Sequence, residues 1–276
     1  MPGSIVKPLA ALAALKNNWD PERIIECDGR SVIQKARIAC ANRYGHGELD
    51  LVGAIERSCN DYFIEMGVEL GADKLSEMYR AAGIGSATGL EIGGSRGLNP
   101  ASRLNSSKYK WRQYDTALIS IGQGMILVSP LQAARFTAAI ANGGKLMEVR
   151  LLKEVYDDTG KLLFANPVRM SEQWQLPDGA LELVHKGMYQ VVNSPTGSGK
   201  SARSDELIIY GKTGTAEVDT AQGRINNTWF TSFTEKNNRR YALTVLVEEG
   251  KSGGRNCAPL AKEFFERFLQ PHKKEN

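Results

Sequence analysis

The N-terminal segment is the feature that most limits what this chain can fold into. Residues 4–15 read Ser-Ile-Val-Lys-Pro-Leu-Ala-Ala-Leu-Ala-Ala-Leu, and nearly all of them are apolar after the first turn. Pro8 is compatible with a helix because it lies near the start. A helix that is apolar on all sides must be buried on all sides. We therefore expect a central core helix, far shorter than the roughly 20 residues that a membrane span needs.

Helical patterns fill most of the first two thirds of the chain. One of them breaks at Ser58-Cys59-Asn60, so we expect Ser58 at a break between two helices. Another begins at Ser129-Pro130-Leu131-Gln132, which has the cap, the proline and the glutamine of a helix N-terminus. The other patterns cover residues 50–57, 61–70, 72–82 and 177–192, and a long loop is predicted over residues 83–112.

The last third of the chain is rich in strand-forming residues. Three strands are expected near residues 206–217, 227–234 and 240–248, and an amphipathic helix follows over residues 259–269. Helices first and antiparallel strands last indicate an α+β fold. We expect an antiparallel sheet covered by N- and C-terminal helices, with a mainly helical lobe.

Composition bounds the domain count and the partners. No linker divides the 276 residues, so a single domain over residues 1–276 is predicted. Lys and Arg together number 35 and Asp and Glu 31, which gives a net charge of +4, and the charges are scattered. A nucleic-acid partner is therefore not implied.

The run Gly211 to Glu217, Gly-Lys-Thr-Gly-Thr-Ala-Glu, mixes a cation, two hydroxyls and a glycine on a predicted strand. The two-residue period of a strand places Thr213 and Thr215 on one face. Gly214 lets another backbone approach closely, and Lys212 supplies positive charge. This combination suits the binding of a carboxylate.

Ser4 and Lys7 are three residues apart, which puts a hydroxyl and an amine on one face of a helical turn. Free lysine has a pKa near 10.4, so a neutral lysine base near pH 7 requires a pKa about 3 units lower. Burial in the apolar helix and a second cation, for which Lys212 is the candidate, would lower it. A second Ser-x-x-Lys at residues 107–110 lies in a polar loop, where its lysine would stay hydrated.

Ser58 and Asn60 add a hydroxyl that can pass a proton and an amide that can hold a substrate carbonyl. Ser-x-x-Lys, Ser-x-Asn and Lys-Thr-Gly, in this order, occur in penicillin-binding proteins and class A β-lactamases. Nearly the whole chain resembles the transpeptidase domain of class B penicillin-binding proteins, and looks more like the elongation type, penicillin-binding protein 2, than the division type. The segments that carry the resemblance are Pro2–Pro8, Gly45-His46-Gly47, Ser58–Phe63, Gly122-Gln123-Gly124, Ser129–Gln132 and Gly211–Glu217.

The resemblance implies acyl transfer on peptidoglycan stem peptides. Ser4 would attack the carbonyl between two terminal D-alanines, and an amine of a neighbouring stem peptide would resolve the acyl-enzyme into a cross-link. β-Lactams should acylate Ser4 by the same route, and no cofactor is required. The other implied roles are Lys7 as base, Ser58 as proton relay, Asn60 as anchor, Lys212 with Thr213, Gly214 and Thr215 as carboxylate clamp, and the backbone N–H groups of Ser4 and Thr215 as oxyanion hole.

Other activities stay open at this point. A class A β-lactamase needs a deacylating Glu in a Glu-x-x-Leu-Asn loop, but the comparable Leu98-Asn99 has Ser95 in that position, which disfavours rapid hydrolysis. A D,D-carboxypeptidase acting on the same peptides is an alternative, because water could replace the amine. A β-lactam-sensing or inactive penicillin-binding module is another, and peptide turnover would discriminate between them.

Three cysteines and a histidine fall within 33 residues and form the ligand set of a Cys3His zinc site: Cys27, Cys40, His46 and Cys59. Their spacings are not the usual short Cys-x2-Cys. We favour a structural zinc ion, since Cys59 flanks the relay serine. A disulfide between Cys27 and Cys40 is the alternative, in keeping with the extracytoplasmic setting that the resemblance implies.

The resemblance also sets expectations for the longer protein. Members of the family carry a membrane anchor, a stalk-like domain and the first strand and helix of the catalytic domain before Pro-Gly-Ser, whereas here only Met1 precedes that motif. We expect a soluble fragment of a protein that is anchored in the inner membrane, faces the periplasm and works with the cell-elongation machinery. A missing strand would leave a sheet edge uncovered.

Overall fold

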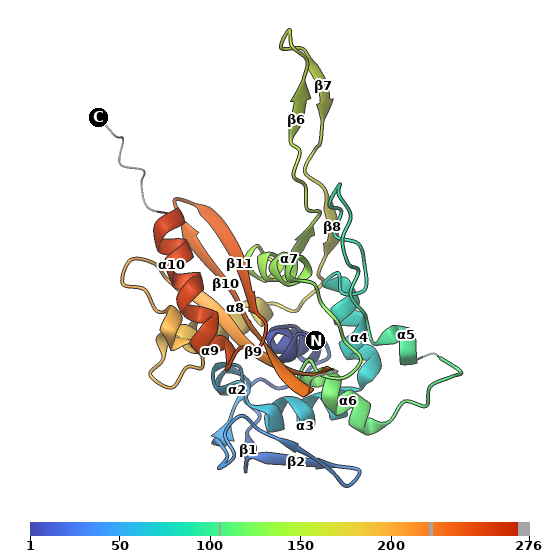
Figure 1. Cartoon of the computed structure of the whole chain (residues 1–276). Coiled ribbons are helices and arrows are strands. Elements are labelled where there is room, and N and C mark those ends of the chain that lie inside the picture. Colours follow the sequence, from blue (N-terminus) through green and yellow to red (C-terminus); the bar gives the residue numbers. More distant parts are fainter. Residues whose placement is uncertain (105, 221–222, 270–276) are drawn as a thin grey trace.

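The computed structural model describes residues 1–104, 106–220 and 223–269. The N-terminal segment begins with a single 3-10 turn, η1 (Gly3–Val6), and continues as helix α1 (Lys7–Lys16). Residues 7–15 are all buried, and α1 packs against α3 (Asn60–Leu70), α4 (Ala72–Ala81) and α8 (Ala180–Asn193). Figure 1 shows α1 nearly end-on at the centre of the molecule, close to the N label. The predicted central core helix is confirmed.

The last third of the chain forms a three-stranded antiparallel sheet in the order β11-β10-β9. Asn237 and Asn238 both have positive φ, 54° and 57°, as the two central residues of the tight turn between β10 and β11. Helix α10 packs on one side of the sheet, while α7 and α8 pack on the other (Figure 1). The α+β fold is therefore confirmed. The bounds are β9 (Ile209–Thr220), β10 (Gly223–Lys236), β11 (Arg239–Val247), α7 (Pro130–Ala141) and α10 (Ala258–Phe268).

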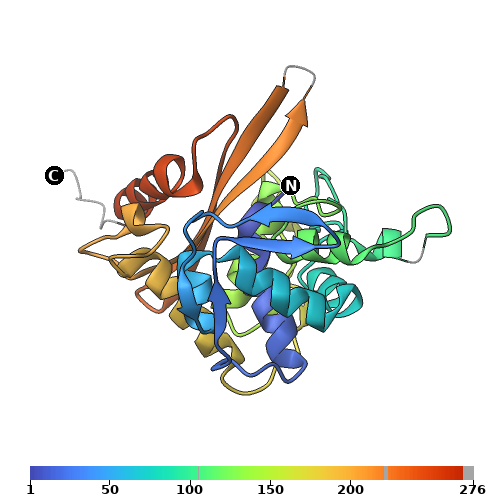
Figure 2. The same cartoon turned by 90° about the horizontal axis from the view of Figure 1, so that it is seen from below.

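The helical lobe contains the predicted break. Helix α2 (Leu51–Arg57) ends at Ser58, which has a left-handed backbone with φ 55°, and Cys59 is the N-cap of α3. Within the segment predicted as a loop, residues 101–104 form the short helix α5 (Ala101–Leu104). Helix α6 (Gln113–Ser120), which the sequence did not suggest, packs against α3. Figure 2 shows α1, α3 and α4 side by side in this lobe.

Short strands form four further antiparallel pairs outside the main sheet. One pair, the β6–β7 hairpin, projects from the body (Figure 1), and its apolar side chains such as Leu163 and Phe164 are exposed. The pairs are β1 (Ile25–Cys27) with β4 (Gly47–Leu49), β2 (Arg30–Ile33) with β3 (Ala36–Ala39), β5 (Lys145–Met147) with β8 (Met170–Gln173), and β6 (Glu154–Tyr156) with β7 (Leu162–Ala165); η2 (Lys200–Ala202) and α9 (Gly253–Asn256) complete the elements. Within the described ranges, no helix has both the length and the apolar character that crossing a membrane requires.

Two glycine backbones meet next to the first turn. Gly3 N–H donates to the carbonyl of Gly122 at 2.9 Å. A Cβ atom on Gly122 would lie 2.0 Å from the Gly3 carbonyl oxygen, and Gly122 has φ +75°. Only glycine fits there, so the loop after α6 is pressed against the turn that carries Ser4.

We expect Gly122→Ala to destabilise the fold more than Gly143→Ala. Gly143 also has a positive φ, +89°, but an added Cβ there meets nothing within 4 Å. Both variants bear the left-handed cost of about 1–2 kcal/mol, and only Gly122→Ala adds a backbone clash of about 1–3 kcal/mol. Urea unfolding of the two variants measures the difference. Equal losses would show that the Gly3–Gly122 contact is not tight.

Candidate active site

Ser4 lies in the 3-10 turn directly before α1. Gly3 takes a positive φ of 57°, and the N–H of Lys7 donates to the carbonyl of Ser4. The neighbours Ile5 and Val6 are fully buried, whereas Ser4 itself is partly exposed. The turn is thus anchored by its apolar residues and presents a serine at the surface.

The Lys7 side chain is fully buried. Its Nζ donates to the carbonyl oxygen of Ser58 at 2.7 Å, to Asn60 Oδ1 at 2.8 Å and to Ser58 Oγ at 3.5 Å. In the described part of the chain, no hydrogen bond joins Lys7 to the Ser4 hydroxyl. Lys7 therefore faces the loop between α2 and α3.

Lys212 reaches the same serine from the sheet. Its Nζ donates to Ser58 Oγ at 2.7 Å and to the carbonyl of Thr213 at 3.1 Å, and the side chain is fully buried. The Ser58 hydroxyl thus lies between two lysines that are far apart in the sequence. The structure thus places Lys7, Ser58, Asn60 and Lys212 within hydrogen-bonding reach of one another.

Burial lowers the pKa of Lys7 to about 8. Burial also holds the pKa of Lys212 well below its ordinary value, and the charge of Lys7 lowers it further. The sequence analysis assigned the lowering of the Lys7 pKa to burial and to Lys212. Burial is the cause of the Lys7 shift, and the effect of charge runs the other way, from Lys7 to Lys212.

The Asn60 amide has a fixed orientation. Asn60 Nδ2 donates to the carbonyl of Ala39 at 2.8 Å, so its oxygen faces Lys7. The backbone N–H of Asn60 donates to Cys40 Sγ at 3.2 Å. The strand β3 and the residue after it therefore hold both ends of Asn60, which sequence reasoning did not anticipate.

The Lys-Thr-Gly segment of β9 packs closely against η1. A Cβ atom on Gly214 would lie 2.8 Å from the Ile5 side chain and 3.0 Å from the Pro2 carbonyl oxygen. Thr213 Oγ1 is hydrogen-bonded to Ser198 Oγ at 2.8 Å. The carbonyl of Thr215 accepts from Gln123 Nε2 at 3.4 Å. Ser198 thus contacts the site, which the sequence analysis did not anticipate.

The three cysteines of the predicted metal site lie near Asn60, and all of them are free thiols. The alternative disulfide between Cys27 and Cys40 is therefore not formed. His46 Nδ1 lies 3.4 Å from Cys27 Sγ and 3.5 Å from Cys40 Sγ, and the Cys40 and Cys59 sulfurs are 3.9 Å apart. All four ligand atoms lie within 4.8 Å of one another. In a tetrahedral zinc site these separations are about 3.5 and 3.8 Å, given Zn–N near 2.0 and Zn–S near 2.3 Å.

Hydrogen bonds and burial shift the pKa values of the three thiols in different directions. The hydrogen bond with Cys59 lowers the pKa of Cys40 and raises that of Cys59. Burial and the hydrogen bond to Asp61 raise the pKa of Cys27. Asp61, which the sequence did not single out, accepts from Cys27 Sγ at 3.0 Å and from the N–H of Gly29 at 3.1 Å. The donor set and its spacing fit zinc.

A serine one turn before a buried lysine, with a second serine between that lysine and one on an antiparallel strand, defines the class shared by penicillin-binding proteins and serine β-lactamases. Within this class, the chain belongs to the penicillin binding protein transpeptidase domain family, whose model matches residues 1–266.

Curated relatives and solved structures support this family assignment. The chain is 32% identical to the peptidoglycan D,D-transpeptidase MrdA of Haemophilus influenzae, over 97% of this chain and 44% of that protein. It is similar in fold to Pseudomonas aeruginosa PBP2 in complex with WCK 5153, with TM-score 0.86, 30% identity and coverage of 99% of this chain and 61% of that one. The complex between PBP2 and MreC from Helicobacter pylori matches with TM-score 0.78 and 28% identity over 96% and 49%. The chain thus spans less than half the length of the curated relative.

Replacing Lys7 by Met should remove a pH dependence of stability. The folded-state pKa of Lys7, about 8, is below the ordinary value of 10.5. Below pH 8 the folded state bears the full cost of the buried charge, and between pH 8 and 10.5 the unfolded chain binds more protons, so the unfolding free energy rises with pH. The wild type should gain about 2.5 kcal/mol over Lys7→Met from pH 7 to pH 10. Urea unfolding at several pH values measures this, and parallel curves would contradict a low pKa.

Proposed function

We propose that the chain is the catalytic part of a D,D-transpeptidase that cross-links peptidoglycan stem peptides. The observation that carries the proposal is the Ser58 hydroxyl between two buried lysines, with Ser4 one turn before Lys7. The name of the H. influenzae relative supports the reaction and its substrate class.

Acylation follows from these contacts. Ser4 Oγ attacks the carbonyl carbon between two D-alanines while its proton passes to neutral Lys7. The new bond joins Oγ to that carbon, the C–N bond breaks, and the departing D-alanine receives a proton through Ser58. The N–H groups of Ser4 and Thr215 hold the developing oxyanion, where one lost donor typically costs about 2.7–4 kcal/mol. Lys212, Thr213, Gly214 and Thr215 form the carboxylate clamp.

Deacylation reverses the proton path. An amine of a second stem peptide attacks the acyl carbon, gives its proton to the same lysine relay and releases Ser4. Asn60 holds Lys7 during both steps through its amide oxygen, and the amide N–H that does not bond to Ala39 donates to the substrate carbonyl. β-Lactams acylate Ser4 by the first step alone.

The wider setting is proposed from the family. The solved complex of H. pylori PBP2 with MreC supports a partner in the cell-elongation machinery. We place the intact protein at the periplasmic face of the inner membrane, held by an anchor.

We also propose that residues 1–276 are one domain of a longer protein. Strand β11 is at the edge of its sheet, and three apolar side chains of α10 nearby are 47–58% exposed: Leu260, Phe264 and Phe268. The additional strand and helix that the resemblance implies would cover both surfaces.

A fluorescent penicillin should label Ser4 covalently, and Ser4→Ala should abolish labelling. The labelling rate should rise with pH and level off above pH 8, because the base must be neutral and the pKa of Lys7 is about 8. Lys7→Arg should reduce the rate at least about 100-fold, since a guanidinium does not lose its proton. Labelling that persists in Ser4→Ala would refute the mechanism.

Turnover of a D-Ala-D-Ala peptide with an amine acceptor then separates a transpeptidase from a carboxypeptidase or a sensor.

We propose further that the Cys27, Cys40, His46 and Cys59 cluster holds a structural zinc ion. Zinc binding displaces the thiol protons and fixes the segment that carries Cys59. Asp61 would then orient the cluster from outside it, as carboxylates beside metal ligands do.

Protein purified without added zinc should contain about one zinc per chain. A chelator should lower its stability by about 2.7 kcal/mol, the effect of a ligand at 100 times its dissociation constant. His46→Ala should lose the metal, whereas Cys257→Ser should keep it, because the buried Cys257 thiol bonds to the Thr228 carbonyl instead. Metal-free protein with unchanged stability in chelator would contradict the proposal.

A further inference from the structure

Two backbone hydrogen bonds fix the chain at the C-terminal end of α1. Asn18 has a left-handed backbone with φ 63°, and its N–H donates to the carbonyl of Leu15 at 3.2 Å. The N–H of Trp19 donates back to the carbonyl of Ala14 at 3.0 Å. These two bonds form a Schellman motif, which satisfies the last helical carbonyls. Trp19 is therefore held at a defined place relative to α1.

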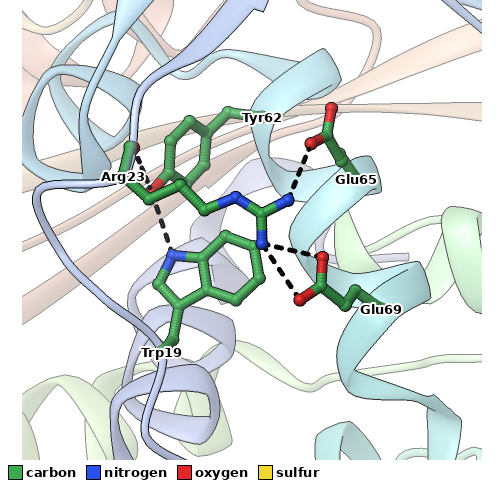
Figure 3. Close-up of polar contacts among 5 residues, drawn as sticks. All are labelled: Trp19, Arg23, Tyr62, Glu65 and Glu69. Atoms are coloured by element: carbon green, nitrogen blue, oxygen red, sulfur yellow. Dashed lines mark hydrogen bonds and ion pairs between the residues drawn. The ribbon is translucent and has the colours of Figure 1, made fainter.

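Trp19 contacts the first turn of α3 through one hydrogen bond. Its Nε1 donates to the hydroxyl of Tyr62 at 3.1 Å, and that hydroxyl donates to the carbonyl of Arg23 at 3.4 Å (Figure 3). Tyr62 is fully buried and lies two residues after Asn60. A buried hydroxyl that loses its partner costs about 1–3 kcal/mol, so this contact has a strong geometric preference.

Arg23 adds a clamp around the same contact. Its guanidinium lies 4.5 Å from the centre of the Trp19 ring and reaches Glu65 at 3.2 Å and Glu69 at 2.8 Å, one turn apart on α3 (Figure 3). These charged side chains are 38–55% exposed. Such exposed pairs contribute little individually, so the partly buried Trp19–Tyr62 hydrogen bond is the main contact and the Arg23 ion pairs are secondary.

These contacts connect Trp19, through Tyr62 and Asn60, to Lys7 in the candidate active site. Lys7 begins α1, and Trp19 follows its end. Trp19 binds Tyr62, Tyr62 shares a helical turn with Asn60, and Asn60 Oδ1 accepts from Lys7 at 2.8 Å. The two helices that carry the base and its amide partner are therefore joined at two points rather than one.

We propose that Trp19 and Tyr62 are positioning residues for acylation: their hydrogen bond sets the orientation of α3 and so holds the Asn60 amide against Lys7. The proposal rests on the proposed function for its effect on rate. Misplacement of a reacting group by 1 Å can cost 100-fold in rate. A smaller tilt of α3 should slow acylation by about tenfold.

The chain offers a matched control in Tyr79. Tyr79 is also a fully buried tyrosine, and its hydroxyl donates to the carbonyl of Ile119 at 2.9 Å, but it belongs to α4. Each variant, Tyr62→Phe or Tyr79→Phe, deletes one hydroxyl of a fully buried tyrosine. Tyr62→Phe removes the bonds to Trp19 and to the Arg23 carbonyl, and Tyr79→Phe removes the bond to the Ile119 carbonyl. A merely structural role predicts a loss of stability in both variants and no difference in acylation.

The first measurement is stopped-flow acylation of the full chain by a fluorescent penicillin. In Tyr62→Phe the first-order acylation constant should fall about tenfold, while the dissociation constant of the initial complex changes less than about twofold. Tyr79→Phe should acylate at the wild-type rate. Equal acylation constants for the two variants would overturn the proposal.

A double-mutant cycle tests whether the effect passes through the bond itself. Trp19→Phe keeps a ring but lacks the N–H donor, and should also slow acylation about tenfold. The double variant should be slowed about tenfold, not about 100-fold, because both changes remove the same Trp19–Tyr62 hydrogen bond. Effects that multiply would overturn the proposal.

Hydrogen exchange separates this proposal from the proposed function. Amides of residues 58–63 should exchange faster in Tyr62→Phe than in Tyr79→Phe, whether or not the protein reacts with penicillin. An unreactive wild type would refute the proposed function, and the exchange rates would then decide the positioning role. Unchanged exchange in Tyr62→Phe would overturn that role.

Discussion

Two ammonium groups buried around one serine hydroxyl are the constraint on which the rest of the structure depends. Removing a charged group from water costs several kcal/mol, and Lys7 and Lys212 come from opposite ends of the chain. Ser58 and Asn60 supply oxygen acceptors that offset part of this cost. The part of this cost that is not offset keeps the pKa values of Lys7 and Lys212 low, and a low pKa is the property that a lysine base needs. The packing of β9 against η1 brings the two lysines to one hydroxyl.

The fold could be predicted wherever a local signal decides the structure. The apolar α1 and the capping box at Ser129 both appear in the structure as expected. The strands within residues 25–49 have only three or four residues each, too few for a periodic pattern to show. Helix α6 was missed for a related reason, because its start depends on a bond between Arg112 and Asp115 rather than on the usual cap residues.

In the candidate site, too, some residues could be proposed from the sequence and others could not. Side chains with defined chemistry at fixed spacing, such as Ser58 and Lys212, could be assigned from the sequence, since the spacing itself limits their geometry. The carbonyl of Ala39 that orients Asn60 could not, because every residue has a carbonyl and only tertiary structure selects one. Ser198 was missed because its contact with Thr213 depends on how a loop approaches the sheet.

The loop from Ser58 to Asn60 explains why the cysteine cluster and the lysine pair occur together. A left-handed backbone at Ser58 costs about 1–2 kcal/mol for a residue other than glycine, and it persists only where its surroundings hold it. On one side, Lys7 binds the Ser58 carbonyl and Lys212 binds its hydroxyl. On the other side, Cys59 lies in the thiol cluster, and Cys40 accepts the N–H of Asn60. The two sides share one strained turn, so a change in the cysteine cluster would shift the Ser58 hydroxyl without a direct contact to either lysine.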